Sequence, residues 1–377
     1  MTLLDSVQSA LSTVIDPELR KPITELGMVG EVEIDDDGAV RVRVLLTIAG
    51  CPLKGTITGD VESALARISG VTSVQVELDV MSQEQRDSLK DLLRPKRGNP
   101  FNEPGSLTKV FAVASGKGGV GKSSVTVNLA SSMAASGLRV GIIDADVHGF
   151  SVPGLLRITQ SPTRVDEMIL PPVAHGIKVI SIGMFLDSNR PVVWRGPMLH
   201  RALEQFLTDV YFGDLDVLLL DLPPGTGDIA ISVAQLLPAS QILVVTTPQS
   251  AAADVAERAG SLAVQTGQRV AGVIENMSWL ELPDGSRMEP FGSGGGSLVA
   301  ERLSATLETE IPLLGQIPLD VRLREGGDAG QPIVMTNPES PAAMELASVA
   351  SKLAAIPRGL SGLQLGVAPL SSGGSDR

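Results

Sequence analysis

One glycine-rich stretch, residues 115–124, constrains this 377-residue chain more than any other feature. It reads Ser-Gly-Lys-Gly-Gly-Val-Gly-Lys-Ser-Ser and fits the phosphate-binding pattern Gly-x4-Gly-Lys-Ser, with an additional lysine, Lys117, directly after the first glycine. An apolar run at 109–114 precedes the stretch, and a helical run at 125–134 follows it. Strand, glycine loop and helix in this order predict a P-loop, which binds the phosphates of a nucleotide.

The predicted P-loop gives each of its residues a role. Its backbone amides face one volume, where the β- and γ-phosphates can sit. Lys122 is expected to neutralise these phosphates, and the Ser123 hydroxyl is expected to hold Mg²⁺. The residues expected to contact the nucleotide are Gly116, Lys117, Gly118, Gly119, Val120, Gly121, Lys122 and Ser123. The alternative is a glycine-rich turn before an ordinary helix.

Composition limits the partners of the chain. The net charge of −13 argues against a dedicated nucleic-acid surface, since the only dense basic run is 94–97. No apolar stretch approaches the ~20 residues of a membrane span, and no secretory signal opens the sequence. Cys51 is the only cysteine, so an internal disulfide is excluded. We expect a cytoplasmic protein without nucleic-acid or membrane partners.

The pattern of the chain predicts two α/β units. Residues 1–93 read as a small α/β domain, 94–108 as an exposed, extended linker, 109–357 as a parallel-sheet P-loop domain and 358–377 as a disordered tail. Helices are clearest at 197–210 and 254–265. The strands expected in the larger sheet are 110–114, 139–144, 178–182, 216–221, 241–246, 270–274 and 313–317.

Polar residues follow three of these strands, where open α/β sheets place their ligands. Asp221 is expected to hold Mg²⁺ through a bound water, and Asp146 is expected to orient the water that attacks the γ-phosphate. Asp144 could exchange roles with Asp146. Asn276 follows the third strand, after Glu275. Helix capping or turn chemistry is the alternative for each acid.

The early lysine of the P-loop resembles the deviant P-loop of the ATPases that include the Min and Par division proteins and the nitrogenase iron protein. Within that group the chain resembles the Mrp/ApbC family, described as iron–sulfur cluster carriers, over essentially all of 109–357. The motifs that carry this resemblance are Trp194-Arg-Gly-Pro-Met198, Asp221-Leu-Pro-Pro-Gly-Thr-Gly-Asp228, Glu275-Asn-Met-Ser278 and Phe291-Gly-Ser-Gly-Gly295.

The resemblance implies an α/β P-loop ATPase that hydrolyses ATP with Mg²⁺ and delivers clusters to apoprotein clients or assembly partners. In that group two subunits face each other across two ATP molecules. The resemblance therefore implies a homodimer in which Lys117 reaches the phosphates of the partner's nucleotide and Asn276 hydrogen-bonds the adenine. ATP is favoured over GTP because no Asn/Thr-Lys-x-Asp guanine motif follows the P-loop.

The N-terminal unit resembles the small domain found in iron–sulfur assembly proteins. Asp16-Pro-Glu18, Leu26-Gly-Met-Val29 and Thr47-Ile-Ala-Gly-Cys51-Pro52 carry that resemblance. Cys51 precedes an expected helix, whose N-terminus would lower the thiol pKa and favour a metal-binding thiolate. A small buried side chain is the alternative.

The chain departs from the Mrp/ApbC family at one point. The family usually carries Cys-x-x-Cys between the Asn-Met-Ser and Phe-Gly-x-Gly-Gly motifs, whereas Leu282 and Gly285 stand near those positions here. Cys51 from each of two subunits remains as a protein ligand for a cluster. Two functions stay open: an ATP-dependent cluster carrier, or an ATP-dependent dimeric switch that recruits a protein partner without binding a cluster.

Overall fold

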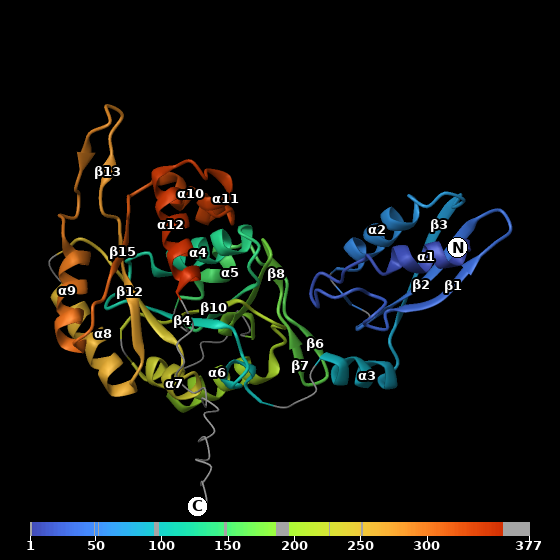
Figure 1. Ribbon diagram of the computed structural model, residues 1–377, viewed down its shortest axis with the longest axis horizontal. Coiled ribbons are helices and arrows are strands. Elements are labelled where there is room, and N and C mark those ends of the chain that lie inside the picture. The colour runs from blue at the N-terminus through green and yellow to red at the C-terminus, as the bar shows by residue number, and fades with distance from the viewer. Residues whose placement is uncertain are drawn as a thin grey trace, which may run out of the picture.

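The computed structural model describes residues 2–48, 50–51, 53–93, 98–146, 149–185, 196–225, 227–249 and 252–356, without the side chains of 228, 252–254, 256 and 257. A small N-terminal α/β unit lies beside a large α/β domain (Figure 1). This confirms the predicted fold class. The expected tail at 358–377 lies outside the described residues.

The large domain is built on an eight-stranded sheet, in the order β15-β12-β11-β4-β10-β5-β9-β8. Every neighbouring pair is parallel except β8 with β9 at one edge. All seven strands expected from the sequence are confirmed to within two residues. Their bounds are β4 Lys109–Ala114, β5 Val140–Asp144, β9 Ile177–Ser181, β10 Val217–Asp221, β11 Gln241–Thr246, β12 Arg269–Asn276 and β15 Leu313–Ile317, with the short β8 at Val173–Ala174.

Helices cover both faces of the sheet, because its strands are apolar on both sides. Helix α4 (Lys122–Ala135) packs on one face with α5 (Ser151–Leu155), α11 (Ile333–Thr336) and α12 (Pro341–Ala355), and α10 (Val321–Ala329) joins this group. The other face carries α6 (Gly196–Asp209), α7 (Asp228–Leu236), α8 (Ala252–Thr266) and α9 (Gly295–Leu307). The core therefore forms two apolar layers, one on each side of the sheet.

The nucleotide motifs lie at the carboxyl ends of the parallel strands of this sheet. Strand β4 is central, and the strands that follow it in sequence are added on both sides of it. The P-loop after β4 therefore lies at the switch point of strand order, next to the ends of β10 and β11. Ligands of open α/β sheets bind in this position.

The N-terminal unit has a three-stranded sheet in the order β1-β2-β3, covered by helices. Its bounds are α1 Leu3–Leu11, β1 Val29–Ile34, β2 Ala39–Leu46, α2 Lys54–Leu65, β3 Ser73–Val80 and α3 Gln83–Leu93. Helix α1 begins with a capping box, in which the Thr2 side chain accepts from the Asp5 amide and the Asp5 side chain accepts from the Thr2 amide. Helix α3 was not predicted from the sequence, because most of its residues are polar and it buries only Leu89 and Leu93.

A hairpin of the large domain completes the core of the small one. Strands β6 (Thr163–Val165) and β7 (Met168–Leu170) contribute Val165, Met168 and Leu170 to the apolar cluster of the N-terminal unit. Lys90 of α3 forms an ion pair with Asp166 in the turn of this hairpin, 2.6 Å between Nζ and Oδ2. The two units are thus packed together, and not merely tethered.

Most of the described linker residues, 98–108, are exposed as predicted, but the segment is not extended throughout. Residues 94–97 lie outside the described residues, but Pro100–Asn102 form the short helix η1. Phe101 is buried in the core and meets Phe212 edge to face, with ring centroids 5.9 Å apart. The side-chain amides of Asn99 and Asn102 both donate to the carbonyl of Leu236. One aromatic side chain and two amides therefore fix this segment to the domain.

Candidate nucleotide site

The P-loop has the predicted strand–loop–helix setting. It leaves β4 at Ala114 and enters α4 at Lys122, with Gly119 and Gly121 in left-handed conformation at φ 79° and 77°. Gly121 precedes the helix and offers no side chain to cap it. The first amides of α4 have no acceptor within the helix, so they remain free to bind an anion.

Two positions of the loop require glycine because neighbouring side chains leave no room for a Cβ atom. A Cβ atom at Gly121 would lie 2.3 Å from Nδ2 of Asn276, and one at Gly116 would lie 2.6 Å from a methyl carbon of Val255. The loop is therefore held between the end of β12 and the start of α8. The loop residues 117–124 also line a cavity of about 290 Å³ together with Asp146, Ser151, Leu155 and Pro224.

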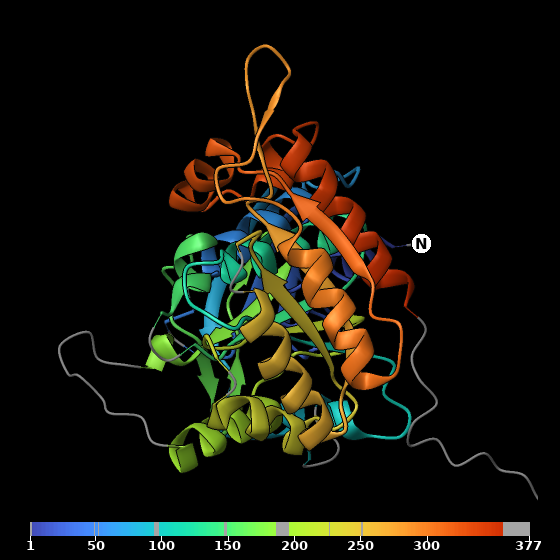
Figure 2. The same cartoon turned by 90° about the vertical axis from the view of Figure 1, so that its left-hand side faces the viewer.

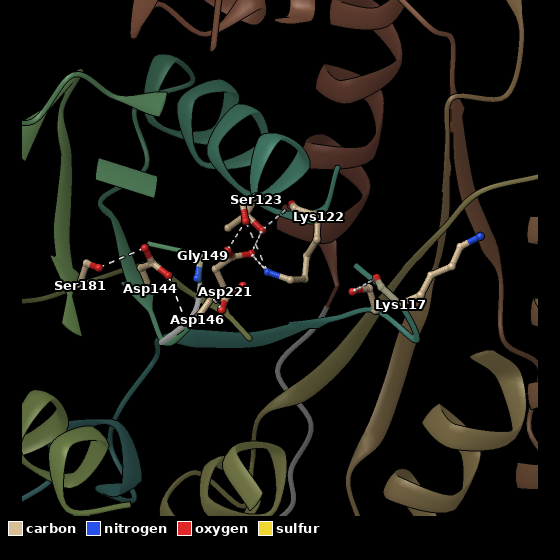
Figure 3. Close-up of polar contacts among 10 residues, drawn as sticks. Lys117, Lys122, Ser123, Asp144, Asp146, Gly149, Ser181 and Asp221 are labelled. Atoms are coloured by element: carbon tan, nitrogen blue, oxygen red, sulfur yellow. Dashed lines mark hydrogen bonds and ion pairs between the residues drawn. The ribbon is translucent and has the colours of Figure 1, made fainter. Parts of the chain in front are cut away.

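Asp221 is the centre of the polar contacts below the loop (Figure 3). It ends β10, is fully buried and accepts from three side chains of α4. These are Nζ of Lys122 at 2.7 Å, Oγ of Ser123 at 2.5 Å and Oγ1 of Thr126 at 2.9 Å. The two predicted P-loop residues and the predicted magnesium acid thus occupy one site.

Asp144 and Asp146 have different surroundings. Asp144 ends β5, pairs in register with Asp221 and accepts from Oγ of Ser181 at 3.1 Å. Burial, and then the charge of Asp221, raises the pKa of Asp144 to about 7. Asp146 lies beyond the strand, accepts from the amide of Gly149 at 3.1 Å and lines the P-loop cavity. Of the two acids, only Asp146 faces that cavity.

Asn276 ends β12 and reaches the P-loop. Its Nδ2 donates to the carbonyl of Val120 at 2.9 Å, while its Oδ1 is buried and has no hydrogen-bond partner among the described residues. The neighbouring Glu275 has a structural role. It accepts from the amide of Gly296 at the start of α9, at 2.5 Å, and from Nε2 of Gln316 at 2.8 Å.

Lys117 points away from the Lys122–Asp221 group (Figure 3). Its Nζ donates to Oε1 of Gln249, in the loop after β11. Nearby, Arg258 of α8 donates to the carbonyl of Gly116 at 3.0 Å. Lys117 therefore makes no contact with the groups below its own loop.

The comparisons with known proteins agree with this geometry. Residues 106–354 match the profile of the ParA family that is described as NUBPL iron-transfer P-loop NTPase. The chain belongs to this NTPase family. Its P-loop and its sheet are thus those of a nucleotide-hydrolysing protein, and the resemblance drawn from the sequence motifs is confirmed.

Relatives cover nearly the whole chain. The iron–sulfur cluster carrier protein of Mycobacterium tuberculosis H37Rv is 60% identical over 367 residues, 97% of this chain and 96% of the relative. The iron–sulfur cluster carrier protein of Synechocystis is 40% identical, over 94% and 98% of the two chains. A nucleotide-binding protein from Archaeoglobus fulgidus, solved with ADP, is 37% identical at a TM-score of 0.53, over 63% of this chain and 90% of that one.

The N-terminal unit has a match of its own. Residues 4–78 match the profile described as iron–sulfur cluster assembly protein. Its Asp16, Glu18 and Cys51 are all buried and lie close enough to interact electrostatically. Glu18 accepts across the interface with the NTPase domain from Oγ1 of Thr163 at 3.4 Å.

The expectation of a lowered thiol pKa at Cys51 is wrong. Burial raises the pKa, and the nearby carboxylates of Glu18 and Asp16 raise it further. Amides of Leu53 and Lys54 at the start of α2 act in the predicted direction, but they are outweighed. The alternative interpretation of Cys51, a small buried side chain, describes its packing correctly.

Glu18 gives the interface a pH dependence that can be measured. Burial, and then the charge of Asp16, raises the pKa of Glu18 from 4.5 to about 7. The folded state therefore holds this proton more tightly, so the free energy of unfolding should fall as pH rises from 4.5 to 7. We expect the stability of Glu18→Gln relative to wild type to rise by up to about 3 kcal/mol between pH 4 and pH 8.

Urea unfolding at both pH values measures this difference. Glu31→Gln, at an exposed position on β1, is the matched control and should follow wild type. A stability difference between Glu18→Gln and wild type that does not change with pH would show that the pKa of Glu18 is the same in the folded and unfolded states.

The segment that departs from the cysteine-bearing pattern forms a projecting hairpin (Figures 1 and 2). Its strands are β13 (Leu280–Glu281) and β14 (Arg287–Met288). Leu282 and Gly285 lie in its turn, joined by a hydrogen bond from the Gly285 amide to the Leu282 carbonyl at 2.9 Å. At its base, Arg287 stacks on the ring of Trp279, 4.3 Å from guanidinium carbon to centroid.

Several residues that contact this site were not predicted from the sequence. Thr126 follows Lys122 by one helical turn, so its place beside Asp221 could have been inferred from spacing. Ser181 ends the strand next to β5, which required the strand order. Gln249 and Arg258 carry no sequence signal, because loop and helix packing alone bring them to the P-loop. Of the motif at 194–198, residues 194–195 lie outside the described residues.

Proposed function

We propose that this chain binds and hydrolyses ATP with Mg²⁺, and that it carries an iron–sulfur cluster as cargo to apoprotein clients. The observation that carries the ATPase proposal is the convergence of Lys122, Ser123 and Asp221 below a glycine loop that opens a helix. Membership in the iron-transfer NTPase family, and relatives named iron–sulfur cluster carrier protein, support the proposal that the cargo is an iron–sulfur cluster.

The residues present fit a magnesium ion. Ser123 and Asp221 offer a hydroxyl and a carboxylate, which are the oxygen ligands that Mg²⁺ prefers. Together they would hold the ion, which supplies charge neutralisation to the bound phosphates. Lys122, now paired with Asp221, is placed to exchange that partner for a phosphate, and Asp146 lies in the same cavity as the candidate to orient water.

Asn276 supports adenine as the base. The hydrogen bond from its Nδ2 to Val120 leaves Oδ1 as a buried acceptor without a partner among the described residues. An acceptor matches the 6-amino group of adenine and does not match the 6-carbonyl of guanine. Replacing Asn276 should therefore weaken the binding of ATP more than the binding of GTP.

A homodimer suits the position of Lys117. The side chain faces away from its own phosphate site and is held by Gln249. A lysine so placed can serve a nucleotide on another subunit once Gln249 releases it, and a cation supplied in trans stabilises charge at the γ-phosphate. This supports the arrangement in which two subunits face each other across two ATP molecules.

Cys51 is the single thiol that each subunit can offer to a cluster. Among the described residues no group of three or more His, Cys, Asp or Glu is arranged to hold a metal. Two subunits would therefore supply two thiolates, and the remaining ligands would come from small thiols or from the client's cysteines. Since Cys51 is buried in an apolar cluster that includes residues of both units, loading requires this cluster to open locally.

Anaerobic reconstitution with iron and sulfide tests the cargo. We expect wild type to bind iron, counted per dimer, and we expect Cys51→Ser to lose at least about nine-tenths of it because no other thiol exists. ATP turnover, measured in parallel, should be unchanged in Cys51→Ser. If wild type binds no iron, or if both proteins bind the same amount, the proposal that this chain carries an iron–sulfur cluster on Cys51 is wrong.

One observation favours a second function, an ATP-dependent dimeric switch that recruits a protein partner. The projecting hairpin at 279–290 carries no cysteine, so it offers protein surface and not a cluster site. That function predicts ATP-dependent dimerisation and client capture in iron-free buffer. None of the described helices is long and apolar enough to cross a membrane.

A further inference from the structure

A second cavity lies between the N-terminal unit and the NTPase domain. It has a volume of about 290 Å³ and shares no residue with the cavity at the P-loop. Residues 19–21 and Leu93 close it from the small unit. Gly98, Pro100 and Glu103 close it from the segment around η1, and residues 210–215 close it from the turn after α6. Arg139, directly before β5, and Lys178, on β9, complete the wall.

Lys178 places a buried charge in this wall. The residue is 1% exposed, although it projects from strand β9 of the sheet. Its Nζ lies 3.4 Å from the carbonyl of Tyr211 and 4.8 Å from the centroid of the same tyrosine ring. Among the described residues no carboxylate lies within ion-pair distance of Lys178. A buried ammonium without an ionic partner is costly, so an anion in the cavity would stabilise it.

Three further cations line the same cavity: Arg20, Lys21 and Arg139. Arg20 donates to the carbonyl of Gly176, and Arg139 is paired with Asp216, 3.0 Å between Nη2 and Oδ1. Burial, and then repulsion by Arg20, lowers the pKa of Lys178 to about 8. Burial, and then repulsion by Arg139, lowers the pKa of Arg20. These like charges have thus been brought close together around an open volume.

The carboxylates near this cavity offset only part of its positive charge. Asp16 attracts Lys178 from beyond ion-pair distance, and it accepts from the amides of Glu18 and Leu19, at 2.9 and 2.7 Å. Glu18, with its pKa raised to about 7, carries a proton much of the time near neutrality. Asp214 pairs with Arg139, 3.8 Å between Oδ2 and Nη1, but it is 94% exposed, and Glu103 is exposed at the rim, so water screens both carboxylates.

We propose that this interdomain cavity binds a phosphate group, either free phosphate or the phosphoryl group of a small molecule. Lysine and arginine donors recognise such oxyanions through charge-assisted hydrogen bonds. Because the wall is drawn from both units, the bound anion holds the N-terminal unit against the NTPase domain. The site is independent of ATP binding at the P-loop.

The single tyrosine of the chain makes this proposal easy to test. Protein labelled with 3-fluorotyrosine has one ¹⁹F resonance, which reports on Tyr211 and therefore on this cavity. Inorganic phosphate is titrated at constant ionic strength, with the P-loop saturated by a non-hydrolysable Mg·ATP analogue, whose γ-phosphate group fills the position that free phosphate could otherwise take. We expect a saturable shift of the resonance, with a half-point in the millimolar range or below. A parallel titration with glycerol phosphate shows whether a phosphate monoester binds more tightly than the free ion.

Variants assign the shift to the cavity. Lys178→Met keeps the aliphatic packing and should abolish the shift, and Lys21→Gln, near the surface, should raise the half-point at least about tenfold. Lys54→Gln, an exposed lysine of α2 that does not line the cavity, should leave the half-point unchanged. A shift that grows linearly without saturation, or one that persists in Lys21→Gln with the same half-point, would overturn the proposal.

Discussion

Replacing Lys122 by alanine is expected to weaken ATP binding by at least about 100-fold and to abolish measurable turnover. Lys122 is 6% exposed, and its ammonium is the cation at the centre of the P-loop site, 2.7 Å from Asp221. Removing one partner of a buried, hydrogen-bonded charge pair costs about 2–5 kcal/mol, and each 1.4 kcal/mol is a factor of ten. Calorimetric titration of Mg·ATP measures the loss.

Lys117→Ala is the matched control, because it removes a lysine of the same loop. That side chain contacts Gln249 and not Asp221, so binding of ATP to the monomer should change by less than about threefold. Turnover should still fall if Lys117 acts across a dimer. Thermal unfolding without nucleotide must show that Lys122→Ala is folded, since Asp221 keeps its bonds from Ser123 and Thr126. Full ATP affinity in folded Lys122→Ala would mean that the nucleotide binds elsewhere.

Replacing Asp146 by asparagine is expected to slow ATP hydrolysis by about 100-fold or more, while the affinity for ATP stays within a few-fold of wild type. A positioned acid or base contributes about 10²–10⁴-fold to rate. Asparagine keeps an oxygen that can accept from the Gly149 amide, so the loop geometry is preserved. Single-turnover kinetics with pre-bound ATP separate this effect from binding.

Asp144→Asn is the control that distinguishes the two acids. Asp144 is fully buried behind the cavity, and its pKa of about 7 means that a neutral side chain is tolerated there. We expect its turnover at pH 6.5 to remain within about fivefold of wild type. Equal losses in both variants would show that Asp144 acts with Asp146, and a loss confined to Asp144→Asn would reverse the assignment.

Local patterns were enough to predict the strands of the large domain and the P-loop. Buried parallel strands are nearly continuous apolar runs, and a glycine loop that ends in Lys-Ser between a strand and a helix is specific to phosphate binding. Elements without such patterns were missed. Helix α3 is mostly exposed, and the short strands β6, β7, β13 and β14 have two or three residues each. The linker is mostly exposed as predicted, but composition did not reveal its short helix or that Phe101 is buried.

The amino-acid sequence by itself determined the fold class, the P-loop and the family, because these depend on residues close together in the chain. Only the tertiary structure decided which acid faces the phosphate site, where Lys117 points and how Cys51 is surrounded. Those properties depend on side chains brought together from distant segments, such as Gln249 beside Lys117 and Lys178 near Glu18. Burial at such contacts sets the pKa of Asp144, Glu18 and Cys51, and no local pattern encodes it.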